Sequence, residues 1–169
     1  MLTGILFSCS NDLEKIKQIT QLDNLPDEVS TQLHMVTTDS GYVRYELRGV
    51  IVETYRQPAA KTLIKDGLEV TFYNRETNEI EAILTAYYGE QEADGDRMFV
   101  RDSVVLKNIV KQQQLETDEL IWRNDSVFSN KPVVVKTADG ILWGKGIVAD
   151  QTFDKFVITE PTGEKYFKD

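Results

Sequence analysis

The sequence has little of the chemistry that most enzymes need. It contains one cysteine and one histidine among 169 residues. A disulfide within the chain is excluded, a zinc site of Cys and His cannot be assembled, and a histidine-based triad would have to use His34. We therefore expect no metal, no cofactor and no enzymatic activity. A pair of catalytic carboxylates from distant strands is the weaker alternative.

Basic residues are also scarce. The chain has 19 Lys and Arg against 28 Asp and Glu, which gives a formal net charge of −9. Clustered cations are needed to displace the counterions of nucleic acid, so we expect no nucleic-acid partner. Residues 44–65 differ, with five basic and two acidic side chains and a net charge of +3. This stretch either flanks an anionic headgroup or membrane surface, or is a solvated face.

No apolar run reaches the roughly 20 residues that span a bilayer. Leu6-Phe7-Ser8-Cys9, followed by Ser-Asn-Asp, nevertheless resembles a bacterial lipobox, in which the cysteine is acylated after cleavage. The basic and apolar parts of a signal peptide are both cut short here. We interpret residues 1–9 as a truncated signal, expect a start site upstream of Met1, and expect lipidation of Cys9. The alternative is a chance cysteine.

Residues 10–31 are polar and predict a short helix or a tether. From residue 32 to 169 the sequence consists of short alternating runs between Gly, Asn and Asp turns, which is typical of an all-β domain. About eleven strands are expected, with a bend at Gly49. They cover 32–37, 42–55, 68–74, 80–88, 97–101, 103–108, 115–123, 126–129, 132–137, 141–149 and 153–159.

A short internal sequence repeat adds to this pattern. Residues 104–107 read Val-Val-Leu-Lys, and residues 133–136 read Val-Val-Val-Lys, 29 positions later. Similarity at this spacing predicts a repeating unit of two or three strands.

Several segments together resemble the LptC family, and more narrowly its version in Bacteroidetes-type bacteria. The resemblance covers roughly residues 33–164. The segments that carry it are Thr38–Gly41, Gly67–Tyr73, Leu115–Trp122, Val133–Thr137, Gly144-Lys145-Gly146, Ala149–Phe153 and Pro161–Glu164.

The resemblance implies a twisted, open antiparallel β-jellyroll that faces the periplasm. It implies a non-enzymatic carrier, which receives lipopolysaccharide from the inner-membrane Lpt ABC exporter and passes it to the periplasmic bridge protein LptA. A usual member has an N-terminal transmembrane helix, whereas this chain shows a truncated lipobox. We expect a lipid anchor on the periplasmic face of the inner membrane, with the outer membrane as the alternative.

A carrier of this kind needs an apolar trough, lined by the inward residues of the strands. Plain core packing is the alternative for each of them. The predicted lining is Val70, Phe72, Leu84, Ala86, Met98, Val104, Leu106, Leu120, Trp122, Val135, Leu142, Val148, Phe156 and Ile158.

By analogy with the family, the last strand, around 153–159, would dock the bridge protein, and the first strand, around 33–37, the exporter's periplasmic domains. The chief alternative function is a surface lipoprotein whose sheet binds a glycan or another protein.

Overall fold

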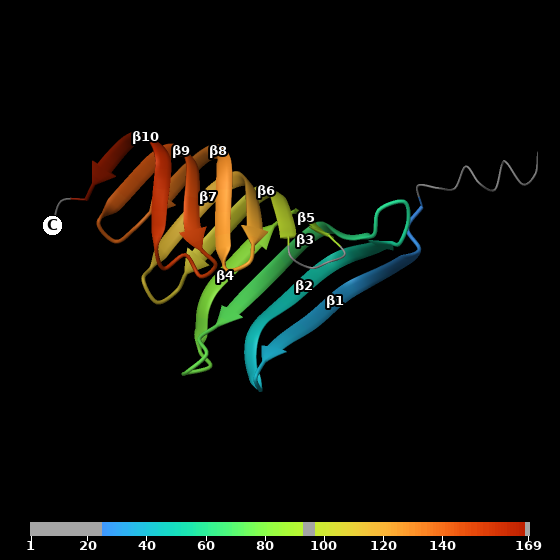
Figure 1. Cartoon of the computed structure of the whole chain (residues 1–169). Coiled ribbons are helices and arrows are strands. Elements are labelled where there is room, and N and C mark those ends of the chain that lie inside the picture. The colour runs from blue at the N-terminus through green and yellow to red at the C-terminus, as the bar shows by residue number, and fades with distance from the viewer. Residues whose placement is uncertain (1–24, 93–96, 168–169) are drawn as a thin grey trace, which may run out of the picture.

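The computed structural model describes residues 25–92 and 97–167, and within them the chain forms ten strands and no helix (Figure 1). All paired neighbours run antiparallel, in the order β1-β2-β3-β4-β6-β7-β8-β9-β10, with β5 between β3 and β6. The strands are β1 (Glu28–Asp39), β2 (Tyr42–Tyr55), β3 (Lys61–Tyr73), β4 (Ile80–Ala86), β5 (Tyr88–Glu92), β6 (Arg97–Asn108), β7 (Gln113–Arg123), β8 (Ser126–Lys136), β9 (Gly140–Asp150) and β10 (Phe156–Tyr166).

The all-β prediction is confirmed, with differences in how the runs are joined. The runs at 97–101 and 103–108 form one strand, β6, as do the two runs that make up β8. The run at 80–88 instead divides into β4 and β5 at Tyr87. β1 already begins at Glu28, so residues 28–31, assigned to the tether, belong to the sheet. Cys9 and the lipobox lie outside the described residues.

One line of irregular positions crosses the whole sheet. The backbone N–H of Gly67 donates to the carbonyl of Tyr87 (3.0 Å), and the N–H of Tyr87 donates to the carbonyl of Asp102 (2.9 Å). Register shifts and left-handed residues continue this line, and the bend predicted at Gly49 is confirmed by the shift beside it. The irregular positions are 32, 50, 66–67, 87, 102–103, 118–120, 130–131 and 146.

The sheet folds over along this line, which we call the crease, because bulges bend a strand and re-aim its side chains. Trp122 of β7 contacts Phe72 of β3, with ring centroids 5.0 Å apart, although β4 and β6 separate the two strands in the sheet. The fold therefore has two layers facing one interior. The first layer comprises 33–49, 68–86, 104–117, 132–145 and 160–166, and the second comprises 25–31, 51–65, 88–92, 97–101, 121–129 and 147–158.

The middle of the interior is filled by apolar side chains from both layers. Leu106 and Leu115 of the first layer and Ile147 of the second are fully buried. Burial of such side chains stabilises the fold by about 1.5–3 kcal/mol each. β1 and β10 are the edge strands, and they lie at opposite ends of the molecule (Figure 1).

The short sequence repeat corresponds to a repeat in the structure. β6 and β8 show the same succession of buried and exposed residues, with three exposed positions where each crosses the crease. The Val-Val-Leu-Lys and Val-Val-Val-Lys segments come directly after those positions, so the repeat records two strands that bend at the same place.

No helix long and apolar enough to cross a bilayer occurs in the part of the chain that the structure describes.

Candidate functional site

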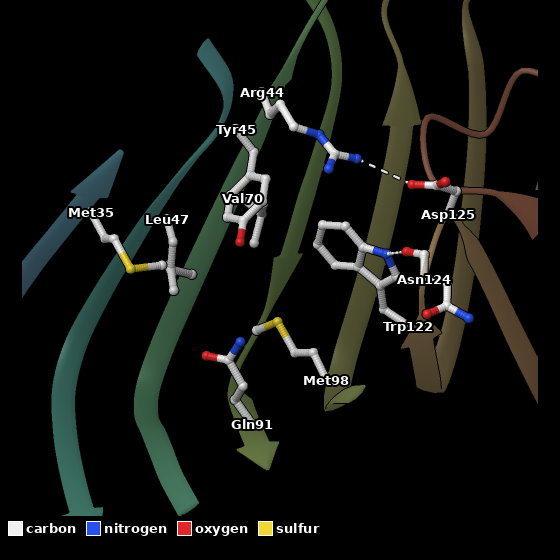
Figure 2. A pocket seen from close by; sticks show the side chains of 10 residues that line it. All are labelled: Met35, Arg44, Tyr45, Leu47, Val70, Gln91, Met98, Trp122, Asn124 and Asp125. Carbon is white, nitrogen blue, oxygen red and sulfur yellow. Dashed lines mark hydrogen bonds and ion pairs between the residues drawn. The ribbon is translucent and has the colours of Figure 1, made fainter. Parts of the chain in front are cut away.

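The interior opens into a cavity at the β1 end of the molecule (Figure 2). Its volume is about 190 Å³. β1, β2 and β3 supply its first-layer side, and β5, β6, β7 and the β7–β8 turn supply the other side. The lining residues are Met35, Arg44, Tyr45, Leu47, Val70, Gln91, Met98, Trp122, Asn124 and Asp125.

Two aromatic rings, those of Tyr45 and Trp122, line this N-terminal cavity, and Phe72 of the core packs against both. The Trp122 ring lies between the layers, 5.6 Å from the Tyr45 centroid and 5.0 Å from that of Phe72. The Trp122 indole Nε1–H donates to the carbonyl of Asn124, which fixes the ring orientation (Figure 2). Aromatic and thioether side chains offer broad apolar contact with few directional demands, which suits a flexible hydrocarbon ligand.

An ion pair bridges the rims of the two layers beside this cavity. Arg44 of β2 donates from Nη2 to Oδ1 of Asp125 in the β7–β8 turn, at 3.1 Å (Figure 2). Both side chains remain exposed to solvent, so the ion pair contributes little to stability and water can replace it.

A second cavity lies at the β10 end. It is open, has a volume of about 490 Å³, and is lined by side chains of β9 and β10. Leu142 and Trp143 come from the first layer, and Phe156 and Ile158 from the second. This C-terminal cavity and the N-terminal cavity thus lie at opposite ends of one interior.

The predicted lining residues fall into groups in the structure. Val70, Met98 and Trp122 line the N-terminal cavity, and Leu142, Phe156 and Ile158 line the C-terminal cavity. The others between them are packed in the core: Phe72, Leu84, Ala86, Val104, Leu106, Leu120 and Val135. Whether any of the fourteen contacts a lipid stays a prediction.

The inward orientation expected for Val148 is wrong. Its side chain is 49% exposed on the outer face, whereas its neighbours Ile147 and Ala149 belong to the core. Strict alternation from Leu142 would point Val148 inward. The crease at Gly146, where φ is +87°, shifts the alternation by one residue.

Sequence reasoning missed several residues that line the cavities. Tyr45 and Leu47 alternate along the run at 42–55, and Met35 does so along 32–37, so the period-two pattern could have identified them. Gln91 and Asn124 carried no such signal, because a polar residue near a turn resembles a solvated one.

The basic stretch at 44–65 is largely neutralised in the structure. Arg44 pairs with Asp125, Lys61 with Glu90 (3.4 Å), and Lys65 with Glu53 (2.7 Å). Arg48 lies 3.4 Å from Glu46, which also accepts a contact from His34 at 3.2 Å. This pairing favours the solvated-face interpretation over a dedicated anion site.

Perturbed titratable groups are explained by neighbouring pairs. Hydrogen bonding to Lys136 lowers the pKa of Glu116, and hydrogen bonding to His34 lowers the pKa of Glu46. Burial, with a hydrogen bond to Glu90, raises the pKa of Tyr88 to about 12. Burial, followed by the charges of Asp154 and Asp150, raises the pKa of Glu81. Across residues 25–92 and 97–167, no group of three or more His, Cys, Asp and Glu side chains is placed to hold a metal ion.

Comparison with known protein families identifies one family. The model of the family described as lipopolysaccharide-assembly, LptC-related, matches residues 1–161. No curated protein matches the chain.

Proposed function

The chain belongs to the LptC family of lipopolysaccharide-assembly proteins, and from that premise we propose that it is a non-enzymatic carrier that holds the acyl chains of lipopolysaccharide between its two layers. Family membership gives it a role in lipopolysaccharide transport. The proposal adds where the lipid is held, from what it is received, and to what it is passed.

The physical difficulty of this task is the exposure of hydrocarbon to water. Each methylene buried contributes about 0.8 kcal/mol, so one acyl chain of roughly fourteen carbons represents on the order of 10 kcal/mol. A carrier must shelter each chain along most of its length. It must also release it, which favours many weak apolar contacts over a few strong polar ones.

The observation that carries the proposal is an apolar interior that opens at both ends. The N-terminal cavity adjoins β1, and the C-terminal cavity adjoins β10. In this proposal lipid enters beside one edge strand and leaves beside the other, and the side chains that fill the middle of the interior move aside for it. Lining by Met35, Met98 and Trp122 is soft and adaptable, as acyl chains of variable length require.

We propose that the two edge strands extend the interior into neighbouring proteins by strand addition. An edge strand presents unpaired N–H and C=O groups, which are a template for another strand. β1 would pair with the periplasmic domains of the inner-membrane Lpt ABC exporter, and β10 with the bridge protein LptA. Each junction would continue the apolar interior from one protein to the next.

We propose further that the β domain is held at the periplasmic face of the inner membrane by acylated Cys9 through a tether that ends before β1. The outer membrane is the alternative location. Stable anchoring by acyl chains needs at least two membrane-binding signals, which a fully acylated N-terminal cysteine supplies.

Site-specific photo-crosslinking tests the carrier function. Benzoylphenylalanine in place of Trp122 is expected to label lipopolysaccharide in cells, because that side chain lines the N-terminal cavity. The matched control is the same substitution at Val148, which is exposed on the outer face. Labelling from Val148 but not from Trp122 would contradict the proposal and favour a glycan- or protein-binding surface.

A further inference from the structure

The β9–β10 loop, residues 151–155, folds into the space between the two rims of the molecule. Phe153, at its tip, is fully buried, although the segment is a loop. Its ring stacks on Phe156 with centroids 5.0 Å apart. A loop residue this deeply buried takes the place of a core side chain.

This loop lies close to residues of both cavities. Gln151 and Thr152 line an opening of about 420 Å³ that also contains Arg44 and Asp125, both of which line the N-terminal cavity. On the other side, Phe156, against which Phe153 stacks, lines the C-terminal cavity. Phe153 therefore lies where a path between the cavities would pass.

The backbone of the loop is held in an unfavourable conformation. Phe153 has a φ of +56°, in the left-handed region that bulky residues rarely adopt. Such a conformation persists only where surrounding contacts impose it. The strain favours release of the loop once an alternative occupant fills the interior.

The buried ring and several hydrogen bonds impose it. The N–H groups of Phe153, Asp154 and Lys155 donate to Asp150 (3.0, 2.8 and 2.9 Å), and that of Gln151 donates to the Asp125 carbonyl (3.1 Å).

Two further contacts reach the other layer. The buried Asn108 amide donates from Nδ2 to the carbonyl of Thr152 (3.0 Å). Lys111 Nζ lies 2.7 Å from Asp154 Oδ1 and donates to the Asp154 carbonyl (3.1 Å). Both contacts join the loop to the opposite rim, and the Lys111 pair is partly exposed to water.

The N-terminal cavity is too small for a whole acyl chain. A cavity of about 150 Å³ holds one benzene molecule, so one of about 190 Å³ holds only the end of a chain. A longer stretch of hydrocarbon needs side chains to move out of the interior. Phe153 is the member of the core cluster that lies in a loop, whereas the others lie in strands.

We propose that Phe153 occupies an acyl-chain site and that the 151–155 loop is a displaceable plug, which a long saturated chain replaces to join the two cavities. This rests on the proposed carrier function. The ring fills the interior when no lipid is present and leaves it, together with the loop, when hydrocarbon takes over its contacts.

Removing the plug side chain tests the proposal. Phe153→Ala is expected to bind pyrene-labelled palmitate roughly fivefold to tenfold more tightly than the unaltered protein, because the chain no longer competes with the ring. The control is Leu115→Ala, which removes an equally buried side chain held within a strand. This control is expected to lose stability without gaining affinity. Weakened binding by Phe153→Ala, to the same degree as by Leu115→Ala, would overturn the plug.

A reversible lock keeps the proposal testable if Phe153→Ala does not fold. Lys111→Cys and Asp154→Cys place two thiols on the loop and the opposite rim, and Cys9→Ser removes the native thiol. A bifunctional methanethiosulfonate reagent joins the two thiols through disulfides that reduction cleaves. The cross-linked protein is expected to bind pyrene-labelled palmitate about tenfold more weakly than the same protein after reduction. Equal affinity in both states overturns the plug alone. Absence of binding in both states and in the unaltered protein overturns the carrier function and the plug with it.

Discussion

At the scale of single residues, the interior depends on rings that touch across the layers. Trp122 is the clearest case, because its ring meets Tyr45 and Phe72 from the other layer and lines the N-terminal cavity at the same time. The same side chain therefore contributes to stability and offers a surface to a ligand.

Trp122→Ala is expected to lower the free energy of unfolding by about 2–4 kcal/mol, from lost apolar burial and two lost aromatic contacts. Trp122→Phe keeps most of the ring contacts and is expected to lose about half as much. Urea denaturation measures both. Equal losses in the two variants would show that the ring contacts contribute little.

Glu81 gives a pH-dependent prediction. Burial, and then the charges of Asp154 and Asp150, raise its pKa above the ordinary value of 4.5. The folded state therefore favours the protonated acid. The stabilisation of the fold that results is fully present below pH 4.5 and is lost as pH rises through the raised pKa. Glu81→Gln, which stays neutral, is expected to be more stable than the unaltered protein at pH 7 and equally stable at pH 4.

Glu116→Gln is the opposite control. Hydrogen bonding to Lys136 lowers the pKa of Glu116. Ionised Glu116 therefore stabilises the fold above pH 4.5, and this stabilisation is lost as pH falls. Thermal unfolding at several pH values is expected to show a loss for Glu116→Gln at pH 7. A gain at pH 7 for both variants, or for neither, would contradict these pKa directions.

At the scale of strands, the crease decides which face each side chain takes. Alternating runs and the bend at Gly49 were predictable, because period two and a glycine within a long run are local signals. The joining of two runs in β6 was not, since Asp102 and Ser103 have the composition of a turn but serve as a bulge within one strand. Val148 was misplaced for the same reason. Residue 153 was assigned to a strand at 153–159, whereas residues 151–155 form a loop and β10 begins at Phe156.

Gly146 tests the crease directly. A Cβ at this position would lie 2.3 Å from Thr159 Oγ1 and 3.2 Å from the Ser129 carbonyl, in a backbone with φ of +87°. Gly146→Ala is expected to lower the free energy of unfolding by about 2–4 kcal/mol, from backbone strain and crowding together.

Gly41→Ala is the matched control for this substitution. Gly41 has nearly the same φ, +88°, but no atom lies within 4 Å of its added Cβ. Only backbone strain remains, and the free energy of unfolding is expected to fall by about 1 kcal/mol. Similar losses at both glycines in urea denaturation would mean that the crease tolerates a side chain.

At the scale of the whole molecule, one sheet folded over on itself gives two open ends and two different edges. Val157, beside the C-terminal edge, is 66% exposed, and Val36 on β1 is 46% exposed. Photo-crosslinkers at these positions report which protein each edge meets. Val157 is expected to label the soluble bridge protein, and Val36 the exporter's periplasmic domains. Exchange of the two products would reverse the proposed direction of transfer.

The central claim is that hydrocarbon, and not the sugar, is what the interior holds. Titration calorimetry of the purified protein with lipopolysaccharide and with its deacylated saccharide, at several temperatures, tests this most directly. The acylated form is expected to bind with a negative heat-capacity change, which marks apolar burial, and the deacylated form is expected not to bind. Equal binding of both forms, with no heat-capacity change, would contradict the claim.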